Sequence, residues 1–168
     1  MADPITNPAT PEAIFGKDAV TAAMADHIAI VGLAEFITDA KWDRQELTLT
    51  VVPETIVAAC EAAKAAGYNF MEDVTAVDWY PTEPRFQISY SLLSHTFKQR
   101  LRVVARVAEG QTIASITGVW PAANFYEREV FDLFGVTFTG HPRLTRIMMP
   151  DNWNGHPLRK DYPVEGYR

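Results

Sequence analysis

Three stretches of sequence decide the fold: FMEDVTAVDWY (70–80), RFQISYSLLS (85–94) and QRLRVVARV (99–107). All three are strand candidates, and in the last two Phe86, Ile88 and Tyr90, and likewise Leu101, Val103 and Ala105, alternate with other residues, the period-two pattern of a strand face. The short polar connection between the last two stretches indicates an antiparallel pair. These residues therefore predict the centre of a β-sheet.

Two more strands and two helices are expected on the N-terminal side of this centre. AEFITDAK (34–41) and QELTLTVV (45–52) predict a hairpin. Apolar residues at helical spacing predict a helix over 17–32, and an Ala-rich helix over 53–67 begins at a proline and ends at a glycine. The order predicts an α+β fold: a two-layer sandwich with a mixed sheet of about five strands, helices on one face, and an extended C-terminal arm.

A third helix is expected to begin at Pro121 or Ala122 and to end at Gly135. Its polar side carries four charged residues, Glu127, Arg128, Glu129 and Asp132. Arg128 and Asp132 are spaced to pair along the helix, and Glu129 with Asp132 suggests an acid–base or metal pair. The sequence has no nucleophile elbow, HExxH motif or Cys–His pair, so ion pairs with arginines of the arm or of a partner are favoured over catalysis.

The arm over 141–168 is rich in proline and arginine and shows no regular periodicity. Its Trp, Tyr, Met and Arg residues are typical of protein interfaces, so we expect the arm to order on a partner. His141 and His156 each stand between glycine and proline, where a turn histidine bonded to the backbone is favoured over a metal ligand. The expected domains are a flexible leader (1–16), an α+β domain (17–140) and this arm.

Composition excludes several functions. Cys60 is the single cysteine, so the chain has no internal disulfide and cannot build an iron–sulfur cluster from its own thiolates. The formal net charge is −6, which argues against a nucleic-acid partner. The sequence has no glycine loop of a nucleotide-binding type and no apolar run of the ~20 residues that a membrane span requires.

Three segments in the right order carry a resemblance to a known family. They are WPAANFYEREVFDLFG (120–135), its overlapping continuation EREVFDLFGVTFTGHPRLTRI (127–147), and GHPLRKDYP (155–163). Together they resemble the complex I 30 kDa subunit family, which includes the C subunits of bacterial NADH:quinone oxidoreductases. Similarity extends upstream through TAVDW and RFQISYSLLS and so covers roughly residues 30–168.

The resemblance implies a structural subunit of the peripheral arm of complex I, a peripheral protein on the cytoplasmic side of the inner membrane. It implies packing on the 49 kDa-type (D) subunit and on the cluster-carrying B and I subunits. NADH, FMN, iron–sulfur clusters and quinone would be bound by other subunits, with no catalytic, cofactor or metal residue here. The implied interface residues are Glu127, Arg128, Glu129, Asp132, His141, Arg146, Trp153, Arg159, Lys160 and Asp161.

Three alternatives stay open from the sequence. The chain could be the homologous subunit of a membrane-bound hydrogenase or another complex I-like dehydrogenase. It could be a stand-alone hydrolase that uses Glu129 and Asp132, or an assembly factor that leaves the finished complex.

Overall fold

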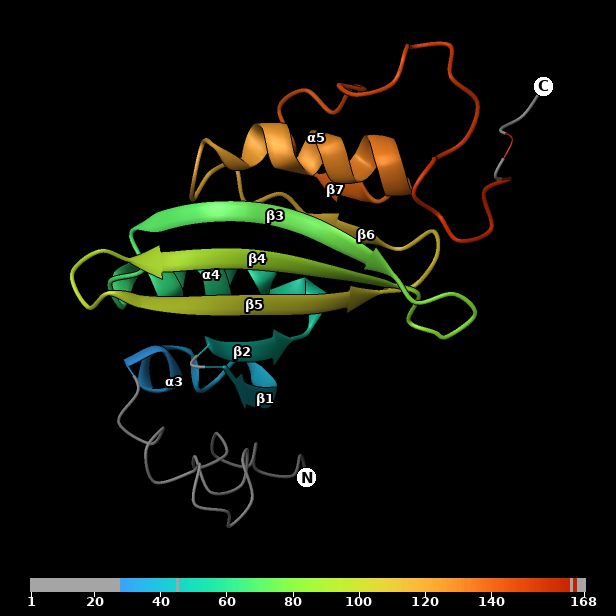
Figure 1. The fold of residues 1–168 in the computed structure, drawn as a ribbon. Helices are drawn as coiled ribbons and strands as arrows, with labels where there is room; N and C mark the ends of the chain where they lie inside the picture. Colours follow the sequence, from blue (N-terminus) through green and yellow to red (C-terminus); the bar gives the residue numbers. More distant parts are fainter. Residues whose placement is uncertain (1–27, 45, 164, 166–168) are drawn as a thin grey trace, which may run out of the picture.

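The computed structural model describes residues 28–44, 46–163 and 165, and it contains the five strands expected from the sequence. They are β1 (Ile37–Asp43), β2 (Glu46–Val51), β3 (Phe70–Asp78), β4 (Phe86–Ser94) and β5 (Gln99–Val107). They form one sheet in the order β1-β2-β5-β4-β3 (Figure 1). The β2–β5 pair is parallel and the other pairs are antiparallel, which confirms the mixed sheet.

One face of this sheet is the core. Its buried side chains come mainly from β2 to β5 and include Leu47, Leu49, Ile88, Tyr90, Leu92, Leu101 and Val103, all 0% exposed. The opposite face carries polar residues, among them the ion pair between Arg102 and Glu46 at 2.8 Å. This one-sided burial is the arrangement that period-two alternation predicts.

Two helices cover the core face. A 3₁₀ turn η1 (Pro53–Thr55) leads into α4 (Ile56–Ala65), which lies behind β4 and β5 in Figure 1 and buries Cys60. Only the end of the other predicted helix is described, as α3 (Ile28–Leu33); residues 17–27 and the predicted leader 1–16 lie outside the described part.

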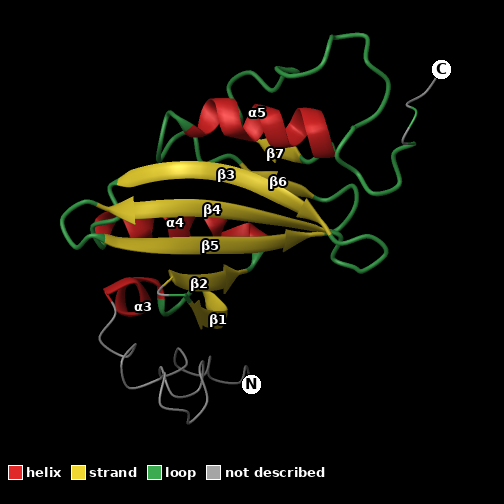
Figure 2. Cartoon of the chain, in the orientation of Figure 1, coloured by secondary structure: helices red, strands yellow, loops and turns green. Residues whose placement is uncertain are grey.

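The third predicted helix is α5 (Ala123–Phe134), which lies along β3 (Figures 1 and 2). It connects two short parallel strands, β6 (Thr112–Ala114) and β7 (Thr137–Thr139), which the sequence did not predict. Gly135 ends the helix with φ of +76°, a left-handed conformation that favours glycine. No helix of the described residues is both long and apolar enough to cross a membrane.

Candidate interaction site

Asp132 of α5 anchors the arm. Its side chain is fully buried, and Oδ2 accepts the backbone N–H groups of Ile147, Met148 and Met149 at 2.9, 2.7 and 2.9 Å. Oδ1 accepts a hydrogen bond from Arg146 at 2.5 Å. Burial alone would raise the pKa of this carboxyl, but the three backbone donors and Arg146 outweigh burial and lower the pKa. Asp132 is therefore ionised, and the arm folds around its charge.

Arg146 ties the next loop of the arm to the same place. Its guanidinium donates to Asp132 and also to the carbonyl oxygens of Trp153 and Gly155, both at 3.1 Å. Arg128 does not pair with Asp132 as helical spacing predicted. It donates instead to the carbonyl oxygens of Thr145 and Arg146, both at 3.0 Å, because Asp132 points into the arm.

The tail of the arm, residues 159–161, binds where β3 ends and β4 begins. Arg159 donates to the carbonyl oxygen of Phe134 at 2.6 Å, so this part of the tail lies against the end of α5. Asp161 pairs with Arg85 at 2.5 Å, and the backbone N–H of Lys160 donates to Asp78 at 2.8 Å. The arm was expected to order on a partner, but its described residues are held to its own domain by contacts that reach from Arg146 to Asp161.

Arg85 is the buried centre of this fastening, with 1% exposure. It pairs with Asp78 at 2.8 Å and Glu109 at 2.9 Å as well as with Asp161. Burial would raise the pKa of Asp78, but hydrogen bonds from Arg85 and from the backbone of Lys160 and Tyr80 lower it to about 2. Hydrogen bonds with Asp78 and Asp161 raise the pKa of Arg85.

Sequence reasoning missed Asp78, Arg85 and Glu109. The available signal was a charged residue near the end of one predicted strand, Asp78, and another at the first position of the next, Arg85. That signal does not reveal that the two charges share one buried site.

Glu127 is also fully buried, on the side of α5 near β6. Its carboxylate accepts the Ser115 hydroxyl at 2.6 Å and the Ile116 N–H at 2.7 Å. Burial raises the pKa of Glu127 although these two hydrogen bonds oppose the shift. The carboxylate therefore holds the segment that follows β6 against α5.

The two histidines bond to the backbone, as their turn positions predicted. His141 Nδ1 accepts the N–H of Arg143 at 3.0 Å, so Nε2 carries the hydrogen and donates to the Asn124 carbonyl at 3.1 Å. His156 Nδ1 donates to the Asp132 carbonyl at 2.9 Å. Burial lowers the pKa of His156.

The proposed catalytic pair does not form. Glu129 is exposed while Asp132 is buried and holds four donors, so the two carboxylates do not share a site. Among the described residues no group of three or more His, Cys, Asp or Glu is arranged to hold a metal ion. The structural basis for a stand-alone hydrolase is therefore absent from this part of the chain.

Apolar side chains of the arm face outward. The N–H groups of 147–149 are bonded to Asp132 and the carbonyl oxygens of Trp153 and Gly155 to Arg146, while several apolar side chains of this part of the arm are exposed. The exposed fractions are 60% for Met148, 51% for Leu158 and 39% for Trp153. On α5, Phe125 is 62% exposed.

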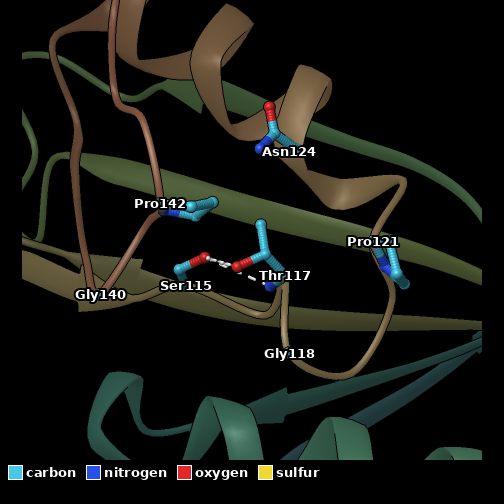
Figure 3. Close-up of a pocket in the computed structure, with 7 residues that line it drawn as sticks. All are labelled: Ser115, Thr117, Gly118, Pro121, Asn124, Gly140 and Pro142. Carbon is cyan, nitrogen blue, oxygen red and sulfur yellow. Dashed lines mark hydrogen bonds between the residues drawn. The ribbon is translucent and has the colours of Figure 1, made fainter.

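An open cleft of about 470 Å³ lies where α5 and the arm begin (Figure 3). Its lining comes from the β6–α5 connection, the first turn of α5 and the turn after β7. The lining residues are Ser115, Thr117, Gly118, Pro121, Asn124, Gly140 and Pro142.

Comparison with known proteins agrees with this architecture. The family described as "Respiratory-chain NADH dehydrogenase, 30 Kd subunit" matches residues 49–168. The NADH-quinone oxidoreductase C subunit of Geotalea uraniireducens is 50% identical over 135 residues, which cover 79% of this chain and 82% of that relative. The corresponding protein of Geobacter metallireducens is 52% identical over 133 residues, which cover 77% of this chain and 82% of that relative.

Two solved structures are similar as well. One is a trypsin-resistant fragment (1–134) of Nqo5, with a TM-score of 0.58 and 31% identity, covering 62% of this chain and 88% of the fragment. The other is the membrane-bound sulfane sulfur reductase, an archaeal respiratory membrane complex, with a TM-score of 0.73, 26% identity and 85% of each chain covered. The chain belongs to the 30 kDa subunit family of respiratory-chain NADH dehydrogenase, and it is a C subunit of the peripheral arm of complex I, as its motifs predicted.

Proposed function

We propose that this subunit has no redox centre and presents the arm as a preformed surface to the subunits around the quinone site. The partners we propose are the 49 kDa-type (D) subunit and the cluster-carrying B and I subunits. The observation that carries the proposal is that backbone groups of the arm are bonded to Asp132 and Arg146 while the side chains of Met148, Trp153 and Leu158 are exposed.

Exposed apolar side chains on an ordered segment favour a protein interface. Met148, Trp153 and Leu158 lie within eleven residues of one another, and all three are substantially exposed although the backbone between them is fixed. Trp and Met are enriched at interface cores, and a packed surface of this kind loses little conformational freedom on binding.

The implied interface residues divide into three groups under this proposal. Asp132, Arg146, His141 and Arg159 hold the arm in shape, and Glu127 holds the segment after β6 against α5. Glu129, Trp153 and Lys160 are exposed and are proposed to meet a partner directly. Arg128 and Asp161 are engaged within the chain, and they fix the start and the end of the arm.

We propose that NADH, FMN, the iron–sulfur clusters and quinone are bound by other subunits. The support is chemical: clusters require several thiolates, and the single Cys60 is buried within α4, where burial raises the pKa of its thiol. Membrane attachment on the cytoplasmic side is proposed to come through the assembled complex.

The test uses the full-length chain, tagged and expressed in a strain that lacks its own copy. Replacing Met148, Trp153 and Leu158 together by serine is expected to leave the melting temperature nearly unchanged. Co-purification of the three proposed partner subunits, quantified by mass spectrometry, should fall at least about tenfold, since a few desolvated anchors carry most interface energy.

A matched control replaces Val52 and Val77 by serine, because Val52, just after β2, is 41% exposed, Val77 of β3 is 40% exposed, and both lie outside the arm. Wild-type recovery of the partners with the arm variant would refute the proposal.

A further inference from the structure

The cleft of Figure 3 adjoins the start of the arm, and its lining does not include Met148, Trp153 or Leu158. It opens between the connection before α5 and the turn after β7. Phe125, 62% exposed, stands next to the lining residue Asn124 on the first turn of α5. The cleft is therefore separate from the exposed apolar side chains of the arm, and its lining groups are considered on their own.

The hydroxyl groups of the cleft have fixed directions. The Ser115 hydroxyl donates to the buried Glu127 carboxylate at 2.6 Å, so its hydrogen is committed. The Thr117 hydroxyl lies 2.9 Å from Ser115 Oγ and therefore donates to it, as Figure 3 shows by a dashed line. Thr117 Oγ1 consequently offers only lone pairs to the cleft, where it accepts a donor such as a backbone N–H.

Asn124 complements this acceptor. Its main-chain carbonyl is bonded to His141, and its side-chain amide has no hydrogen bond among the described residues. A carboxamide supplies both donors and an acceptor. The Asn124 amide and the Thr117 Oγ1 acceptor could therefore bind the alternating C=O and N–H groups of a peptide backbone.

The walls allow a backbone to approach closely. A Cβ atom added at Gly118 or at Gly140 would meet no other atom within 4 Å, so the space above both residues is open. Pro121 and Pro142 contribute rings without N–H donors. An open cleft with no charged side chain in its lining would leave much of a small molecule exposed, so an extended peptide suits it better.

Charge next to the cleft is positive. Arg143 follows the lining residue Pro142, is exposed, and its side chain has no ion pair or hydrogen bond within the described residues. The nearby carboxylate of Glu127 is buried and already accepts two donors. The complementary charge on an occupant is negative.

We propose that the cleft at Thr117, Gly118 and Asn124 receives an extended, carboxylate-bearing peptide segment from a neighbouring subunit of the complex. This inference rests on the proposed function, because it places the segment at the edge of the same partner-facing surface.

The first test fills the cleft with a side chain. Gly118→Leu is expected to fold normally, because its backbone is not left-handed and the added atoms begin in open space. It should reduce recovery of partner subunits at least about tenfold, since a buried steric clash excludes the occupant. Ala58→Leu adds the same side chain at an exposed position of α4 and should assemble like the wild type.

A second variant does not depend on how the cleft accommodates a leucine. Arg143→Glu changes an exposed side chain without partners among the described residues. It should weaken recovery about tenfold by placing like charges together, with Arg143→Lys restoring it. Wild-type recovery with both Gly118→Leu and Arg143→Glu would overturn the inference.

Photo-crosslinking separates this inference from the proposed function. A photoreactive residue is placed at 118 in one sample of the intact complex and at 148 in another. A crosslink from 118 to an acidic segment of another subunit supports the inference. Crosslinks from 148 but not from 118 would overturn the inference and leave the proposed function standing, and their absence from both would overturn both.

Discussion

Replacing Asp132 by alanine should release the arm from the domain. The change removes the acceptor of three backbone N–H groups and of Arg146, all of which meet a carboxylate that is 0% exposed. Breaking a buried charged pair costs roughly 3–5 kcal/mol. We expect local release rather than global unfolding, because the arm can swing into water and hydrate its donors while the sheet keeps its core.

Native-state hydrogen exchange with residue resolution measures this effect. Since each 1.4 kcal/mol corresponds to about tenfold, amides 147–149 should lose at least about a hundredfold protection. Amides of β4, which lie in the core of the sheet, should change less than about threefold. In Asp132→Asn, the loss of protection at 147–149 should be smaller than in Asp132→Ala. The asparagine carbonyl oxygen still accepts N–H groups, while the asparagine amide opposes Arg146.

Glu129→Ala is the matched control, because Glu129 is on the same helix but is exposed. It should leave exchange at 147–149 unchanged. Unaltered protection of these three amides in Asp132→Ala would refute the view that this carboxylate anchors the arm.

Three further predictions concern the glycine that ends α5, the buried Asp78 and the arm as a whole. Gly135→Ala should lower the melting temperature more than Gly110→Ala, because both glycines are left-handed but a Cβ at Gly135 would lie 2.5 Å from Arg159 and 2.7 Å from His156; equal losses would argue against tight packing of the tail. The pKa of Asp78 is depressed to about 2, so its stabilising effect of about 2 kcal/mol is complete above the unfolded pKa and is lost as pH falls from about 4 to about 2. Urea unfolding from pH 7 to 2 should show this loss in the wild type and not in Asp78→Asn, and parallel curves would contradict it. Deleting 141–168 should leave a domain that unfolds cooperatively in urea yet does not co-purify with its partners, and recovery of those partners would count against the arm.

The strands were predictable because alternation extends over enough residues to define a face. The strands β2 to β5 each continue the pattern for at least six residues, and their observed bounds lie close to the predicted ones. The strands β6 and β7 have three residues each, too few for any period to show. Their pairing depends on α5 bringing Ile113 beside Phe138, which local sequence does not encode.

The site was predictable in its residue types and not in its pairings. The charges of α5 were expected to meet arginines of the arm, and Asp132 does meet Arg146. Helical spacing favoured Arg128 as its partner instead, because local reasoning cannot anticipate three consecutive arm N–H groups converging on one carboxylate. The cluster at Arg85 joins Asp78, Glu109 and Asp161 from distant parts of the chain, and only the tertiary fold brings them together.

The wrapping of the arm around Asp132 sets an order of events during synthesis. The anchor lies on α5, while the groups that bind it come later in the chain, so residues 147–149 have nothing to hold until that helix has formed and packed. The apolar surface that we propose for other subunits therefore cannot form before α5 is in place. A copy whose domain is unfolded would have the same residues but would lack this surface. Under the proposed function, such a copy would not be incorporated into the complex.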